Sequence, residues 1–364
     1  MRRISLISLL LCIVFVLSAC NRQEIPTPPG ESSQPDDSSS AESKTFTLMY
    51  CMSDSLNPYA SKTLVNNHIT NLLYEPLIKL DEHLKPVYAL ASNVIINENH
   101  CVVTIKNAVF SDGTPLTPDD VVYSIKCAMS SDTPYSVSLK NILNCSVASS
   151  DSVSIILKKH DPYFVNLLDF PIIKQYSDTL KDENDLEIPP TGVGRYQIDT
   201  KNRVLKANAK FYGGEPKIKE ILLTNTPDAE AMNHNIEVGR VDAFFSDLSD
   251  NKIPKMTGVN QSVHLNRLIY MGINMKNPVL AIHQIRYALS AAINRTELCN
   301  KAFFSYAQPA NGPFPSFWQD AKGFQTIENI NNSNIYIANL KEIGYNSKDV
   351  QGFYLADNKT RLFF

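Results

Sequence analysis

The sequence lacks the residue patterns that an exported hydrolase or a metalloenzyme would need. No GxSxG or HExxH motif occurs in its 364 residues, and the seven histidines show no i, i+4 pairing that would place two of them on one metal ion. The formal net charge of −3 leaves no basic excess for binding nucleic acid. We therefore expect no catalytic residues, no metal site, no cofactor and no nucleic-acid partner, and an exported hydrolase is the weaker alternative.

Cysteines at zinc-like spacing are also missing. Beyond Cys12 and Cys20 the sequence has an odd number of cysteines without close pairs: Cys51, Cys101, Cys127, Cys145 and Cys299. Two interpretations stay open, a disulfide in an exported protein or small buried side chains. The chain is long enough to fold without covalent crosslinks, which favours the second.

No hydrophobic run is long enough to cross a bilayer as a helix. The run Ile4–Leu17 has about 14 residues, short of the roughly 20 that a spanning helix needs, and Arg2 and Arg3 precede it. This pattern predicts a cleaved export signal at residues 1–19. The following residues Leu17–Cys20, LSAC, resemble the bacterial lipobox, which implies a lipid on the Cys20 thiol that anchors the mature protein in the membrane.

Residues 20–45 have almost nothing to bury. Asn21–Lys44 is rich in proline, serine and acidic residues, the composition of a disordered linker. A flexible segment of this length reaches roughly 25 to 30 Å. We expect a tether between a lipid anchor and a folded domain that serves a membrane partner.

The stretch Phe110–Tyr123, FSDGTPLTPDDVVY, specifies its local structure most fully. Asp112 and Gly113 predict a turn after the alternating strand around Val102–Ile105. Thr117, Pro118 and the two acids after them predict the start of a helix. By itself the stretch predicts a strand, a turn and a helix with no chemistry.

This string nevertheless resembles the signature of the family 5 solute-binding proteins of ABC transporters, which include peptide, dipeptide and nickel receptors. Further short sequence motifs of the family occur in the same order as in the family, one before this stretch and the others after it. They lie at 74–91, 191–196, 208–221, 239–243, 285–295 and 340–345. Val193, Arg195 and Asn294 depart from the family's usual residues. The glycines in 191–196 do not indicate a dinucleotide site, because a hairpin follows them and a third glycine is missing.

The resemblance implies an α/β fold of the bilobal periplasmic-binding-protein kind, type II and cluster C, with mixed sheets and an inserted second domain. By analogy, domain I comprises 46–57 and 171–267, the inserted domain II comprises 58–170, and domain III begins at 268 and is truncated at 364. We expect a strand at Leu268–Met275, one helix from Ile282 to Arg295, a helix at Ile335–Gly344 and a strand near Phe353.

The function implied is that of an extracytoplasmic, lipid-anchored receptor that captures oligopeptides or dipeptides and delivers them to an ABC permease. A monomer is expected. The alternatives are a solute sensor without a transport role and a truncated, non-functional remnant of such a receptor.

The expected ligand contacts lie where the bilobal geometry turns residues toward the cleft. They are Ser53, Asp54, Ser55 and Asn57 after the first strand, then Tyr74, Pro171, and Asn274 at the start of the third domain. Asp54 would pair with a cationic end of the ligand. The alternative for each of these residues is packing or helix capping, and for the loop at 53–58 it is a plain turn before the next helix.

Overall fold

The computed structural model describes residues 45–130, 132–246, 258–259, 261–263, 265, 267–310, 312–315, 317–318, 320, 338 and 341–342. The export signal, Cys20, the linker to residue 44, most of the helix expected at Ile335–Gly344 and the strand expected near Phe353 lie outside these residues. Within them, no helix is long and apolar enough to cross a membrane.

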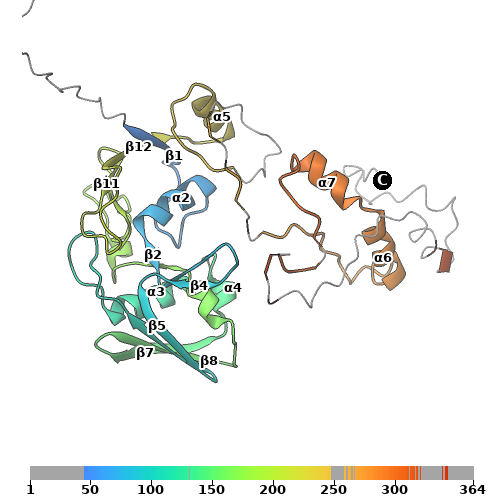
Figure 1. The fold of residues 1–364 in the computed structure, drawn as a ribbon, viewed down its shortest axis with the longest axis horizontal. Coiled ribbons are helices and arrows are strands. Elements are labelled where there is room, and N and C mark those ends of the chain that lie inside the picture. Colours follow the sequence, from blue (N-terminus) through green and yellow to red (C-terminus); the bar gives the residue numbers. More distant parts are fainter. Residues whose placement is uncertain are drawn as a thin grey trace, which may run out of the picture. The chain divides into compact units, whose positions relative to one another are not determined.

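One four-stranded sheet has its strands in the order β1-β12-β11-β10 (Figure 1). The strands are β1 (Phe46–Tyr50), β12 (Glu220–Asn225), β11 (Val204–Ala207) and β10 (Tyr196–Asp199). β1 and β12 are parallel although they are far apart in the sequence, and the other pairs are antiparallel. Helix α2 (Leu64–Leu73) contacts β1 and β10 through a stripe that buries Ile69 and Leu73.

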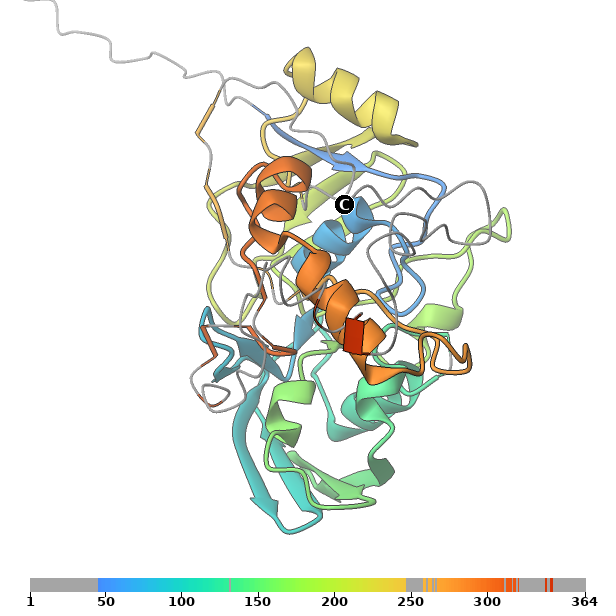
Figure 2. The same ribbon diagram turned by 90° about the vertical axis from the view of Figure 1, so that its right-hand side faces the viewer.

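The second four-stranded sheet is antiparallel throughout, in the order β5-β6-β8-β7. Its strands are β5 (Ala91–Asn97), β6 (His100–Ile105), β7 (Ile142–Ser149) and β8 (Ser152–Leu157). The teal hairpin of β5 and β6 is visible in Figure 2. Strand alternation buries Cys101, Val103 and Ile105 on one face, and helix α3 (Pro118–Ala128) contacts β7 and β8.

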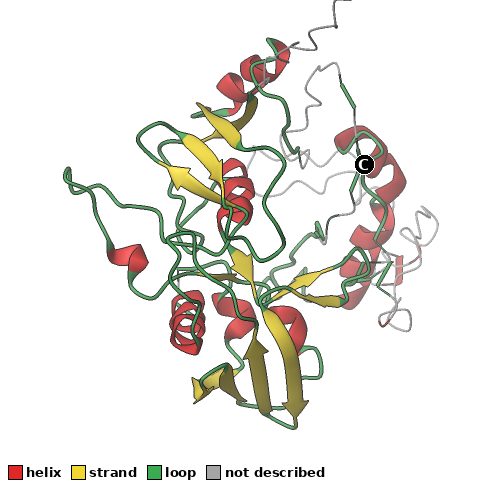
Figure 3. Ribbon diagram, turned by 60° about the vertical axis from the view of Figure 1, so that its left-hand side comes forward, coloured by secondary structure: helices red, strands yellow, loops and turns green. Residues whose placement is uncertain are grey.

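Two short antiparallel ladders connect these sheets (Figure 3). β2 (Glu75–Pro76) pairs with β9 (Pro171–Ile172), and β3 (Ile78–Leu80) pairs with β4 (Pro86–Tyr88). The chain leaves the first sheet through β2 and returns through β9. Buried side chains from both sheets form one connected apolar cluster.

The remaining described elements are helical. They are α4 (Ser136–Leu139), η1 (Phe164–Leu167), η2 (Ser177–Thr179), α5 (Ala229–Glu237), α6 (His283–Ala292) and α7 (Arg295–Ala302). The single helix expected from Ile282 to Arg295 is wrong at its end. Ile293 is extended, and the Asn294 side chain accepts from the Glu297 N–H, which caps a separate helix α7.

The strand expected at Leu268–Met275 is also wrong, because these residues belong to no described strand. Tyr270 is 79% exposed, so the alternating apolar side chains of this segment do not pack against a core. The five cysteines of the described residues are free and buried or partly buried, in agreement with the packing interpretation.

Candidate functional site

The loop after β1 is closed by the carboxylate of Asp54. Its oxygens accept from the Thr63 hydroxyl at 2.6 Å and from the backbone N–H groups of Thr63 at 2.8 Å, Lys62 at 3.1 Å and Ser55 at 2.9 Å. Partial burial raises the pKa of Asp54, but these hydrogen bonds outweigh it, so the pKa lies below the ordinary value. Asp54 therefore shapes the loop and stays ionised.

Replacing Asp54 by asparagine should lower the free energy of unfolding by about 1 to 2 kcal/mol at neutral pH, because one acceptor oxygen is lost. Since the folded pKa is depressed, the contribution of the carboxylate is complete above the unfolded value of about 3.9 and is lost as the pH falls through the folded pKa. Urea unfolding measured from neutral to strongly acid pH should show that the difference in the free energy of unfolding between wild type and variant becomes smaller as the pH falls.

The control is Glu82→Gln, in a side chain that is 84% exposed. A difference for Asp54→Asn that stays constant down to strongly acid pH would contradict this role of the carboxylate.

Asn66, on α2, holds the beginning of the same loop. It is fully buried; its side-chain oxygen accepts from the Cys51 N–H at 2.8 Å, and its amide donates to the carbonyls of Cys51 and Asp54. The loop thereby follows the position of α2. The sequence analysis missed Asn66. Its only signal in the sequence is an asparagine among the apolar residues of the predicted helix.

Two buried tyrosines connect the loop to the returning part of the chain. The Tyr59 hydroxyl donates to the Pro171 carbonyl on β9. The Tyr74 hydroxyl lies 3.0 Å from the Leu56 carbonyl and 3.1 Å from the Pro190 carbonyl, and burial raises its pKa strongly. The structure thus brings Tyr74 and Pro171 together with the loop, in positions where they support it.

The other predicted contacts are divided between two places. The Ser55 hydroxyl accepts from the Asn57 N–H and the Asn57 side chain accepts from the Tyr59 N–H, each at 3.0 Å, while Ser53 is exposed. Asn274 is exposed in a turn, where its side chain accepts from the Lys276 N–H, and no described contact joins it to the loop. Ligand contact by any of these residues stays a prediction.

The loop lies at the carboxyl end of a parallel strand pair. The Met52 N–H donates to the Asn225 side chain at 3.0 Å, and the Thr226 N–H donates to the Tyr50 carbonyl at 2.7 Å. Ligands in open α/β sheets bind beyond the carboxyl ends of the strands. Asn225 is therefore a candidate that sequence reasoning missed, because the parallel pairing of β1 with β12 leaves no local signal.

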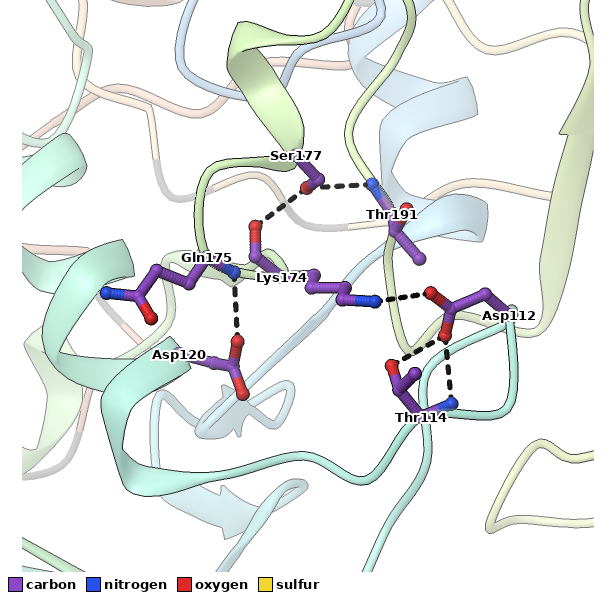
Figure 4. A network of polar contacts seen from close by, with 7 residues as sticks. All are labelled: Asp112, Thr114, Asp120, Lys174, Gln175, Ser177 and Thr191. Atoms are coloured by element: carbon purple, nitrogen blue, oxygen red, sulfur yellow. Dashed lines mark hydrogen bonds and ion pairs between the residues drawn. The ribbon is translucent and has the colours of Figure 1, made fainter.

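The stretch Phe110–Tyr123 fixes the segment that returns from the second sheet (Figure 4). Asp120 accepts from the Thr117 N–H and hydroxyl at the start of α3, as expected for a capped helix, and its other oxygen accepts from the Gln175 N–H at 2.9 Å. Asp112, in the expected turn, forms a 2.7 Å ion pair with Lys174.

Ser177 continues this network, since its hydroxyl donates to the Lys174 carbonyl and accepts from the Thr191 N–H. The distinctive stretch therefore fixes the returning segment 174–177, and two of its acids, Asp112 and Asp120, are paired with protein groups of that segment.

Comparison with known proteins decides the family. The family model of bacterial extracellular solute-binding proteins, family 5 (middle region), matches residues 85–364. The chain belongs to this family. The resemblance drawn from the motifs is thereby confirmed, and with it an extracytoplasmic solute-binding class.

Curated relatives of this family 5 chain include glutathione-binding proteins. GsiB of Salmonella choleraesuis strain SC-B67 is 26% identical over 293 residues, which cover 74% of this chain and 56% of the relative. GsiB of Escherichia coli K12 is 26% identical over 284 residues, 71% of this chain and 54% of the relative. The chain spans about half the length of these relatives.

Solved structures of the same type share the fold. The oligopeptide-binding protein AppA of Bacillus subtilis, in complex with a nonapeptide, matches with a TM-score of 0.59 at 24% identity, over 80% of this chain and 62% of AppA. NikA of Brucella suis, in complex with Fe(III)-EDTA, matches with a TM-score of 0.64 at 16% identity, over 83% and 64%. The mixed α/β fold of bilobal periplasmic-binding proteins is confirmed.

Two of the similar structures contain metal complexes, Ni(L-His) and Fe(III)-EDTA, which raises the question whether this chain has residues that could bind a metal ion. Within the described residues, no group of three or more histidine, cysteine, aspartate or glutamate side chains could hold a metal ion. Asp54 in the loop, and Asp112 and Asp120 in the network around Lys174, accept hydrogen bonds from protein groups.

Proposed function

We propose that this chain is the solute receptor of an ABC importer, which captures peptides outside the cytoplasmic membrane and delivers them to a permease. The observation that carries the proposal is the loop at 51–63, held by Asp54 and Asn66 at the carboxyl ends of β1 and β12 in a family 5 fold. Binding and release by such a receptor need no covalent chemistry, and we propose none.

We propose that the solute contacts this loop. Ser53 is exposed and its hydroxyl lies 3.3 Å from the Cys51 sulfur, Asn225 is partly exposed and accepts from the Met52 N–H, and Ser55 and Asn57 lie in the same loop as Ser53. Asp54 supplies the negative charge there while it holds the loop. Tyr74 and Pro171 position the loop, and Asn274 contributes from the beginning of the proposed third domain.

Peptides are the solute class that the comparisons favour. The curated relatives named above bind glutathione, itself a short peptide, and AppA was solved with a nonapeptide. Nickel is the alternative, because NikZ of Campylobacter jejuni was solved with Ni(L-His).

The proposed receptor is anchored by lipid at Cys20 and tethered by residues 20–45, on the extracytoplasmic face of the membrane. Its domain I comprises 46–57 and 171–267, domain II 58–170, and domain III the residues from 268. The division of domain I into two segments is supported by the pairing of β1 with β12, which lie on either side of the proposed inserted domain in the sequence. We propose that the receptor acts as a monomer.

Calorimetry on the full chain with di- to pentapeptides, glutathione and nickel–histidine tests the function. We expect a peptide to bind, and Asn225→Ala to weaken its binding about ten-fold through the loss of one hydrogen bond. Ser92→Ala, an exposed serine on β5, is the matched control. If none of these solutes binds, the chain is a remnant or the receptor of another solute. If Asn225→Ala and Ser92→Ala bind the peptide with equal affinity, Asn225 is not part of the binding site.

A further inference from the structure

Asp169 carries a carboxylate that has no cationic partner in the described part of the chain. It lies between η1 and β9, and its side chain is exposed. Among the described residues it forms no ion pair and no hydrogen bond to another residue, and its carboxylate accepts only from its own backbone N–H. Both oxygens therefore retain the capacity to accept hydrogen bonds from a ligand.

Protein nevertheless surrounds Asp169 on most sides. Burial raises the pKa of its carboxyl group above the ordinary value, although solvent reaches the side chain. The pKa of Tyr135 is also raised, to about 12, first by burial and then by the charge of Asp169. The Asp169 carboxylate is therefore held near the Tyr135 hydroxyl, in surroundings that solvate an anion poorly.

Aromatic side chains pack around Tyr135. Its ring makes edge contacts with Tyr59 and with Phe170, the residue after Asp169, at centroid distances of 6.1 Å and 6.4 Å. A cation is stabilised both by a carboxylate and by a neighbouring aromatic ring, whereas an anion gains from neither. The surroundings of Asp169 therefore favour a positively charged ligand group.

These residues adjoin the loop at 51–63. Tyr59 belongs to that loop, contacts the Tyr135 ring, and donates from its hydroxyl to the carbonyl of Pro171, two residues beyond Asp169. The carboxylate of the loop itself, Asp54, is occupied, because it accepts hydrogen bonds from the beginning of α2. Asp169 is thus an unpaired carboxylate beside the proposed solute loop.

We propose that Asp169 is a specificity-determining residue of the solute site and pairs with a primary ammonium group of the solute. The amino terminus of a peptide and a lysine side chain both supply this group. The inference rests on the proposed function as a peptide receptor. An ammonium within about 4 to 6 Å stabilises the ionised carboxylate that burial destabilises, whereas a solute without a cation displaces water from Asp169 and returns no ion pair.

Capture of mixed tripeptides by the full chain tests this pairing. The mixture contains random tripeptides with free amino termini and the same tripeptides in N-acetylated form. Mass spectrometry of the bound fraction gives the ratio of peptides with an ammonium group to acetylated peptides without lysine. We expect the wild type to enrich the ammonium-bearing peptides about ten-fold, Asp169→Asn to bring the ratio close to one, and Asp169→Glu to retain most of the enrichment. Enrichment of free over acetylated lysine-free peptides would identify the amino terminus as the paired group, and enrichment of acetylated lysine peptides would identify the side chain.

Glu98→Gln is the control, because it removes a charge of the same sign in the turn between β5 and β6, and it should keep the wild-type ratio. An Asp169→Asn variant that binds less peptide but keeps the wild-type ratio would overturn the pairing, and so would a wild type without preference for an ammonium group. In both cases peptides still bind and the proposed function stands. A wild type that captures no peptide in either form would refute the proposed function, and the role of Asp169 with it.

Discussion

Replacing Gly194 by alanine should destabilise the folded chain by about 3 kcal/mol or more. An added Cβ would lie 2.2 Å from the carbonyl carbon of Leu73 and 2.3 Å from its oxygen, which are backbone atoms at the end of α2. The Gly194 N–H also donates to this carbonyl at 2.9 Å, so the two segments cannot separate without losing a hydrogen bond. Overpacking against a rigid neighbour costs about 1 to 3 kcal/mol, and more when backbone must move.

Urea unfolding of the full chain measures this loss, with Gly272→Ala as the matched control. A Cβ on Gly272 has nothing within 4 Å, and its backbone is outside the left-handed region. We expect that control to change the free energy of unfolding by less than about 0.5 kcal/mol. If Gly194→Ala were as mild as Gly272→Ala, the close approach of α2 to residues 192–194 would be wrong.

Replacing Asp120 by alanine should cost about 3 kcal/mol. The side chain is 6% exposed and performs two tasks, capping α3 through Thr117 and accepting from the Gln175 N–H. Loss of a helix cap costs about 1 kcal/mol, and loss of the hydrogen bond from the partly buried Gln175 N–H to a charged acceptor costs about 1.5 to 3 kcal/mol. Both losses fall on one substitution, because one carboxylate serves both partners.

Asp119→Ala is the control for this prediction, since Asp119 is the exposed neighbour in the same helical turn. It should lose only the interaction with the helix dipole, about 0.3 to 1 kcal/mol. Asp120→Asn should fall between the two alanine variants because it keeps one acceptor oxygen. Equal losses for Asp119→Ala and Asp120→Ala would show that the bond to Gln175 contributes nothing to stability.

Local structure was predictable where neighbouring residues satisfy one another. The turn at Asp112, the start of α3 at Pro118 and the alternating strand at β6 were all expected, and each follows from a pattern of residues close together in the sequence. The expected strand at Leu268–Met275 failed because alternation describes a preference that needs a partner strand. The expected long helix failed because Asn294 can cap a new helix as well as continue an old one.

The candidate site was predictable only in part. The polar loop at 53–57 stood out in the sequence, but the hydrogen bonds that Asp54 accepts from the start of α2 did not, and its contact with a ligand stays a prediction. Asn66 and Asn225 were missed because their hydrogen-bond partners are distant in the sequence. The Asn225 side chain meets Met52 across a separation of 173 residues.

By itself, the sequence determined the family, through motifs spread along the chain, and the local elements, through caps, turns and alternation. The tertiary structure alone decided the parallel pairing of β1 with β12 and the approach of Gly194 to Leu73. The physical reason is distance along the chain. A cap or a turn is satisfied by residues within about four positions, whereas these features need contacts between segments that only folding brings together.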